Sequence, residues 1–234
     1  MNMKLKQVLV SAGLALLLTA CGDKDKSVTE QTKETASNLK EKASETKAAL
    51  LNSDTRENFE AEMNKQLDEA QATITDLEKD RDSETVTKVR EAKDARIKEA
   101  KSHYAELQTE YADFKKDTAE DWKAKRGAVV EKYDSVQAEL KSAIDRNKAE
   151  AEMREKLDKL NAKIDALKAD AKDAKDDAKA KLDADIKTLE EKKADLSEKF
   201  EELQDATKEK WETLKNGLSD AFDDVSKTFK DIFN

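Results

Sequence analysis

The sequence predicts an all-α fold of long amphipathic helices, packed as a coiled coil or an elongated helical bundle, with no β-sheet. Charged residues make up 42% of the 234-residue chain, and the commonest residues are good helix formers. The chain has no proline and four glycines, so the residues that form tight turns are scarce. Apolar residues recur at spacings of three and four, whereas the alternation typical of strands is found over no useful length.

Residues 1–20 are predicted to be a signal peptide. Lys4 and Lys6 give a positively charged start without an acidic residue, and the apolar run 8–20 follows. This run is too short to cross about 30 Å of hydrocarbon comfortably as a helix that rises about 1.5 Å per residue, and it ends in small residues. We therefore expect export followed by cleavage.

The single cysteine of the chain, Cys21, follows Leu18, Thr19 and Ala20. This segment resembles the lipobox of bacterial lipoproteins, in which the cysteine receives a diacylglyceryl group, becomes the first residue after cleavage and is acylated on its amine. The resemblance implies three acyl chains, such as palmitate, and nearly permanent anchoring, because each buried methylene contributes about 0.8 kcal/mol. The alternative is an ordinary secretory signal, with Cys21 as a buried thiol or one half of an intermolecular disulfide.

The residue after the cysteine bears on location. In lipoproteins, aspartate at that place tends to retain the protein at the inner membrane, whereas this chain has Gly22 there and Asp23 one place later. The resemblance therefore implies attachment to the outer membrane, with the chain facing the periplasm. Residues 21–27 are expected to be the acylated cysteine and a flexible tether.

The region 28–210 is predicted to be a long helical or coiled-coil region. It is expected to contain four breaks, near 52–54, 79–85, 127 and 147. Asp54 and Glu57, three residues apart, fit a capping box at the start of a helix. A glycine inside a helix costs only about 1 kcal/mol relative to alanine, so a helix that continues through glycine remains an alternative.

A heptad seam runs through the second half of this region, with apolar residues spaced alternately by three and four. Its members are Leu157, Leu160, Ile164, Leu167, Ala171, Ala174 and Ala178. The seam passes into the alanine-rich stretch 166–185, whose composition resembles late-embryogenesis-abundant proteins. That resemblance implies a helix that forms on drying or on partner binding. The alternative is a solvated stalk, because alanine buries little apolar surface.

Residues 211–234 are predicted to form a C-terminal amphipathic helix, and the apolar face of this helix begins further upstream. Large aromatic residues recur there every eleven positions. Eleven steps of about 100° return to within about 20° of the start, so these side chains form a stripe nearly parallel to the helix axis. The C-terminal stripe comprises Phe200, Leu203, Trp211, Leu214, Leu218, Phe222, Val225, Phe229 and Phe233.

The C-terminal stripe is similar in period and apolar face to the lipid-binding helices of exchangeable apolipoproteins, although it lacks the proline that usually separates their repeats. The resemblance implies a helix that lies on a membrane surface. One alternative is that the stripe packs against another helix of the same chain or of a second copy. A further alternative is that it binds another partner.

No residue pattern indicates catalysis, a cofactor or a metal. The single histidine, His103, has Glu99 four residues before it and Glu106 three residues after it on the same helix face. Zinc sites normally need three or four ligands, so we expect an ordinary surface histidine. The sequence has no glycine-rich phosphate loop, nucleophile elbow or HExxH motif. We therefore expect a protein that is not an enzyme.

The formal net charge of −9 argues against binding to nucleic acid. The expected function is that of a membrane-anchored helical lipoprotein of the bacterial cell envelope, with a structural, scaffold or adaptor role through helix–helix packing. Its expected partner is a second copy or another envelope protein. Two alternatives are a lipid-surface-binding or stress-protective amphipathic protein and a periplasmic partner-binding module.

Overall fold

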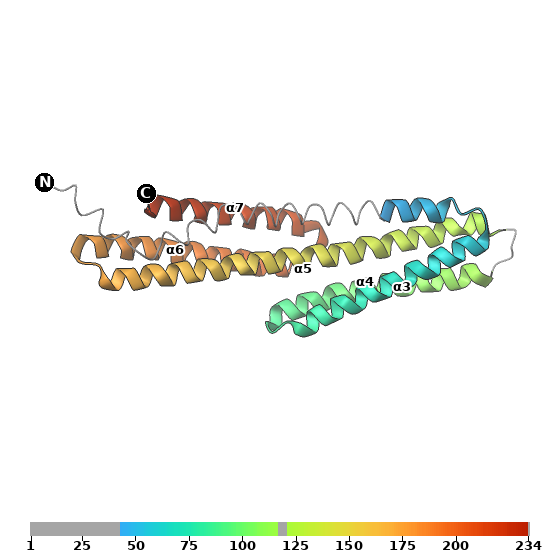
Figure 1. Ribbon diagram of the computed structural model, residues 1–234, viewed down its shortest axis with the longest axis horizontal. Helices are drawn as coiled ribbons and strands as arrows, with labels where there is room; N and C mark the ends of the chain where they lie inside the picture. The colour runs from blue at the N-terminus through green and yellow to red at the C-terminus, as the bar shows by residue number, and fades with distance from the viewer. Residues whose placement is uncertain (1–42, 117–120, 234) are drawn as a thin grey trace. The chain divides into compact units, whose positions relative to one another are not determined.

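The computed structural model describes residues 43–116 and 121–233. Every regular element in these ranges is an α-helix and none is a strand, which confirms the predicted all-α fold class for this part of the chain. Residues 43–51 are helical. The longer helices of the described ranges are α3 (Arg56–Ser83), α4 (Thr87–Lys116), α5 (Trp122–Asp173), α6 (Asp176–Gln204) and α7 (Lys208–Phe233), which are labelled in Figure 1.

The helices pack in two units. Among the described residues, unit 1 comprises 43–67, 106–116 and 121–137, and unit 2 comprises 68–105 and 138–233. Helices α3, α4 and α5 are each divided between the two units, with one segment in unit 1 and the other in unit 2. Each unit is a bundle with its own buried side chains.

The structure has turns at 52–55 and 84–86, the places of the first two expected breaks. The cap of α3 differs from the expected capping box. The backbone N–H of Asn58 donates to Thr55 Oγ1 over 3.2 Å, and the N–H of Phe59 donates to the Thr55 carbonyl over 3.2 Å. Thr55, rather than Asp54, is therefore the N-cap, because its hydroxyl lies within reach of the third helical residue.

The breaks expected near 127 and 147 are wrong, because α5 continues through both positions. Gly127 lies close before Val129 and Val130, whose full burial in unit 1 outweighs a helix penalty of about 1 kcal/mol. The side chain of Asn147 is engaged with Arg96, so it does not compete for the helix backbone.

Two further turns occur; the one at 174–175 has no counterpart among the expected breaks, and the one at 205–207 lies a few residues before the expected start of the C-terminal helix. Residues 174–175 separate α5 from α6, and 205–207 separate α6 from α7, so the C-terminal helix begins at Lys208 rather than at 211. The predicted seam through Ala174 and Ala178 is therefore wrong beyond Ala171, because the chain reverses there. Lys175, at the start of α6, has an extended backbone with φ −114° and ψ 142° and makes no side-chain cap.

Unit 1 has an aromatic core. The rings of Phe59 and Phe114 lie 5.0 Å apart between centroids, and those of Phe59 and Trp122 lie 6.3 Å apart. Two buried tyrosines satisfy their hydroxyl groups: Tyr111 donates to the Glu60 carbonyl over 3.1 Å, and Tyr133 is 2.9 Å from the side-chain oxygen of Gln66. Burial raises the pKa of Tyr111 to about 12.

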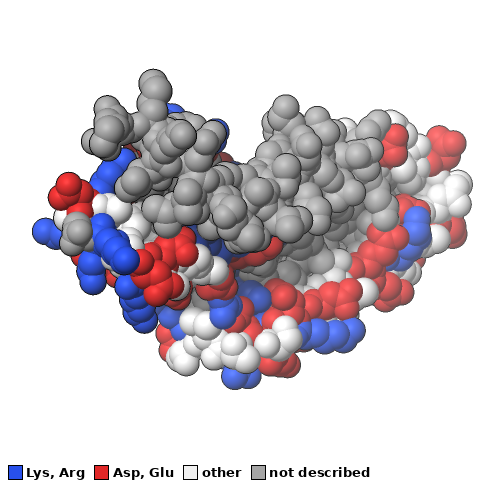
Figure 2. Space-filling model, turned by 60° about the vertical axis from the view of Figure 1, so that its left-hand side comes forward, with Lys and Arg blue, Asp and Glu red and all other residues white. Residues whose placement is uncertain are grey.

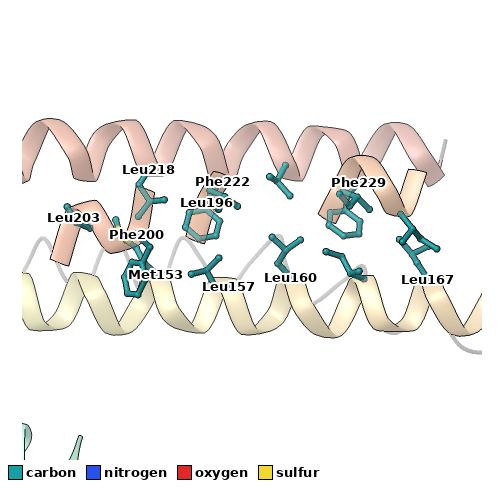
Figure 3. Packing of buried hydrophobic residues seen from close by; sticks show 14 of the residues in the cluster. Met153, Leu157, Leu160, Leu167, Leu196, Phe200, Leu203, Leu218, Phe222 and Phe229 are labelled. Carbon is teal, nitrogen blue, oxygen red and sulfur yellow. The ribbon is translucent and has the colours of Figure 1, made fainter. Parts of the chain in front are cut away.

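In unit 2, α5, α6 and α7 lie side by side (Figure 1) and share one continuous apolar cluster. The heptad seam of α5 forms one side of this cluster, from Leu157 to Ala171, and every seam residue in that span is buried. Leu189 and Leu196 of α6 are fully buried in the same cluster. Figure 3 shows side chains from the three helices pointing into a common space.

Ion pairs join neighbouring helices on the outside of unit 2. Arg81 of α3 pairs with Asp94 of α4 over 2.7 Å, and Lys168 of α5 pairs with Glu190 of α6 over 2.7 Å. On the face seen in Figure 2, basic and acidic groups are intermixed over the described helices. Exposed pairs of this kind contribute about 0 to 1 kcal/mol each, so the apolar cluster supplies most of the stability of unit 2.

Candidate functional site

The C-terminal stripe faces the chain's own helices in this structure. Seven of its nine residues are buried in the apolar cluster of unit 2: Phe200, Leu203, Trp211, Leu218, Phe222, Val225 and Phe229. Leu214 is half-buried and packs against the same cluster. Phe233 is the last residue of α7, and its side chain lies outside the described part of the structure. Phe200 and Leu203 lie on α6 and the other stripe residues lie on α7, so the prediction of one stripe along a single helix is wrong across the 205–207 turn. The buried residues of both parts meet in one cluster with α5.

Cationic side chains cover the aromatic residues of the stripe. Lys156 and Lys163 of α5 place their ammonium groups 5.7 and 5.3 Å from the ring centres of Phe222 and Phe229. Exposed cation–π contacts of this kind contribute about 0.5–1 kcal/mol, and the lysine stems also shield the rings from water. The seam helix therefore holds α7 through its charged residues as well as its apolar ones.

Trp211 marks the start of the stripe in α7. Its indole is 4% exposed, and its Nε1 has no hydrogen-bond partner among the described residues. The guanidinium of Arg146 and the ammonium of Lys215 lie 5.7 and 4.8 Å from its ring centre. Trp211 is therefore enclosed by two cations as well as by the apolar cluster.

The turn at 205–207 is tied to α4 and α5. Arg146 donates to the carbonyl oxygen of Ala206 over 2.7 Å, and Lys208 pairs with Glu139, whose side chain is 12% exposed. Lys88 of α4 pairs with Asp205 over 3.3 Å. Burial, followed by repulsion from the nearby Arg96, lowers the pKa of Arg146 below its usual range. These contacts fix the point at which α7 leaves α6.

A buried polar network lies between α4 and α5 in unit 2. Arg96 and Glu150 are 7% and 2% exposed and form a two-pronged ion pair, with Arg96 Nη1 3.0 Å from Glu150 Oε2. Arg96 Nη1 also donates to Asn147 Oδ1 over 2.7 Å. Burial raises the pKa of Glu150 above its usual range, and the positive charge of Arg96 opposes that rise.

The turn between α3 and α4 extends this network. Lys93 pairs with Asp80 over 3.0 Å, and Arg154 donates to the carboxylate of Glu84 over 2.8 Å. Desolvation alone would raise the pKa of Glu84. The hydrogen bond from the backbone N–H of Val86 and the positive charges of Arg154 and Lys93 outweigh this effect, so the pKa falls to about 2. A cleft of about 220 Å³ adjoins these groups, and a second, of about 790 Å³, lies beside the 205–207 turn.

The single histidine gains a third possible metal ligand from the fold. His103 and Glu99 of α4 and Glu139 of α5 place their ligand atoms within 4.8 Å of one another. Glu106, the other acidic neighbour of His103 in the sequence, is not part of this group. No sequence pattern points to Glu139, because it lies 36 residues away from His103 on another helix.

Cys21 and the whole signal and lipobox segment lie outside the described residues. Among the described residues, no helix combines the length and the apolar character that a membrane crossing requires. Comparisons with models of known families, with curated proteins and with solved structures find no match for this chain.

Proposed function

We propose that this chain is a lipoprotein of the bacterial cell envelope, anchored through acylated Cys21 and acting as a structural, scaffold or adaptor element. The lipobox-like segment 18–21 behind a basic start and an apolar run is the observation that carries this proposal. Two further features support it. The described region is a set of long packed helices, and no residue pattern points to a catalytic centre.

The buried seams favour a particular kind of scaffold. In the described residues, the heptad seam of α5 and the C-terminal stripe of α6 and α7 pack within one chain, and the large apolar residue left exposed is Val86, at 38%. Assembly of copies through these seams would require the bundle of unit 2 to open. We therefore propose that the folded bundle is a spacer or adaptor that meets another envelope protein through its mixed-charge surface.

Replacing Cys21 with serine is expected to abolish acylation and to release the chain from the membrane, because serine lacks the thiol that accepts the diacylglyceryl group. The measurement is labelling of the full chain with a clickable palmitate analogue in a Gram-negative host, followed by membrane fractionation and mass spectrometry of the N-terminal peptide. Gly22→Asp is the matched control, expected to keep the label and to move the protein to the inner membrane. An unlabelled, soluble wild-type chain would contradict the proposal.

A second candidate function is binding to a lipid surface through α7. The observation that favours it is the concentration of large apolar side chains on one face of α7, which the 205–207 turn joins to α6. Exposing Trp211, Leu218, Phe222, Val225 and Phe229 at about 1.5–3 kcal/mol each would cost on the order of 10 kcal/mol. Insertion of the same side chains into a bilayer interface offsets this cost.

The two tryptophans allow a direct test of this candidate. In the Trp122→Phe variant, Trp211 of α7 is the single fluorescent indole, and in Trp211→Phe the reporter is Trp122 of unit 1. The lipid-surface function predicts that vesicles with brominated acyl chains quench Trp211 and leave Trp122 unchanged, because only α7 would enter the bilayer. If brominated and unbrominated vesicles give the same emission from Trp211, and likewise from Trp122, α7 remains packed and the lipid-surface function is contradicted.

A further inference from the structure

The ligand group around His103 is built from two helices of unit 2. Glu99 and His103 lie four residues apart on α4 and therefore share one face of that helix. Glu139 reaches the same point from α5. One imidazole nitrogen and two carboxylate oxygens thus lie within 4.8 Å of one another.

We propose that Glu99, His103 and Glu139 form a binding site for a divalent transition-metal ion of the zinc class. Imidazole and carboxylate are both good ligands for Zn²⁺, and a set of three protein ligands leaves a fourth position for water. Calcium and magnesium fit less well, because they prefer sets made of oxygen alone. This inference is independent of the proposed envelope function.

Side-chain movement alone can bring the three ligand atoms to metal-binding distances. Ligand atoms bonded to zinc at about 2.1 Å lie roughly 3.4 Å apart in a tetrahedral site, closer than the present limit of 4.8 Å. Glu99 is exposed, so its side chain can rotate towards His103, which is itself half-buried. Glu139 is half-buried, with 12% of its side chain exposed, and its ion pair with Lys208 makes it the fixed point.

Two cations compete with a metal at this place. Lys208, in the first turn of α7, pairs with Glu139, and the guanidinium of Arg146 interacts electrostatically with Glu99 and Glu139. Both positive charges lower the affinity for a second cation. A bound metal ion therefore competes with Lys208 for the carboxylate of Glu139, which joins the start of α7 to α5. Removal of the Lys208 charge should make metal binding tighter.

The test uses the untagged full chain labelled with ¹⁵N in histidine, because its single histidine gives one unambiguous imidazole spectrum. Zn²⁺ is titrated while the His103 ring nitrogens are followed by NMR, and the affinity is measured by calorimetry; Co²⁺ provides a visible absorption band that reports coordination. The expected result is one ion per chain, with a large shift of one ring nitrogen.

Three variants and a control make the test specific. His103→Ala and Glu139→Gln should weaken binding by about tenfold or more, and Lys208→Met should tighten it by up to about fivefold, the fold-change that matches the strength of an exposed ion pair. Glu106→Gln removes a neighbouring carboxylate of α4 outside the group and should change nothing. Unchanged affinity in His103→Ala or Glu139→Gln, or no shift of the imidazole signal, would overturn the proposal. Circular dichroism checks that each variant is folded.

Discussion

Replacing Glu150 alone with leucine is expected to lower the free energy of unfolding by about 3–5 kcal/mol, because the change leaves the guanidinium of Arg96 buried without its counter-ion. Arg96 is 7% exposed, so water cannot replace the lost carboxylate without a rearrangement of α4 and α5. The reverse change, Arg96→Met, should be similarly destabilising, since it strands the carboxylate of Glu150. Urea unfolding followed by circular dichroism measures both effects.

The double variant Arg96→Met/Glu150→Leu distinguishes two causes of lost stability: a buried charge without its counter-ion, and poorer packing of the new side chains. It should recover most of the lost stability, because a buried ion pair can often be replaced by apolar residues of similar volume with little loss. Glu155→Gln is the matched control on α5: its ion pair with Lys159 is well exposed, so the expected change in stability is close to zero. If Glu150→Leu costs no more than Glu155→Gln, the pair is not buried as described.

The period of the apolar residues was sufficient to predict the helices but not this ion pair. Met153 lies four residues before Leu157, the first residue of the seam, and Glu150 lies three residues before Met153. The position of Glu150 on the buried face was therefore present in the sequence. Periodicity alone cannot identify Arg96 as its partner, because that residue lies on another helix and resembles its many exposed basic neighbours. Burial of opposite charges depends on which helices meet, and helix pairing is a property of the tertiary fold.

The turns show a second limit of sequence reasoning. Gly127 was a plausible break, yet α5 passes through it, whereas 174–175 consists of alanine and lysine, both good helix formers, and forms a turn. Packing explains the difference. A reversal at 174–175 lets α6 return along the apolar seam of α5, and the area buried in this way outweighs local propensity.

For the C-terminal stripe and the His103 group, the sequence predicted which residues of one helix share a face but not which helix covers that face. The eleven-residue spacing places Trp211 and Phe222 on one face, Phe229 joins that face seven residues further on, and the structure buries all three. The sequence left open what covers this face, because the seam of α5 fits a helix of the same chain as well as one from a second copy. Likewise, Glu99 was visible beside His103, but Glu139 approaches it only when α4 and α5 pack together.

Truncation of Phe222 to alanine is expected to lower the free energy of unfolding of unit 2 by about 3–5 kcal/mol, the range for removal of a buried aromatic ring. Phe222 is 8% exposed and lies in the cluster formed by α5, α6 and α7, as Figure 3 shows. Its loss opens a cavity and removes the ring beneath the ammonium of Lys156. The measurement is urea unfolding combined with amide hydrogen exchange resolved by helix.

Asp223→Ala is the matched control, because it changes the next residue of α7 on the exposed side and should alter stability by no more than about 0.5 kcal/mol. Hydrogen exchange then distinguishes two ways in which Phe222→Ala can act. If α7 is a cooperative part of unit 2, protection falls together in α6 and α7. If α7 separates first at the 205–207 turn, exchange rises in α7 alone, which is the behaviour that binding of α7 to a lipid surface requires. Protection equal to that of Asp223→Ala in all helices would contradict the assigned packing of the stripe.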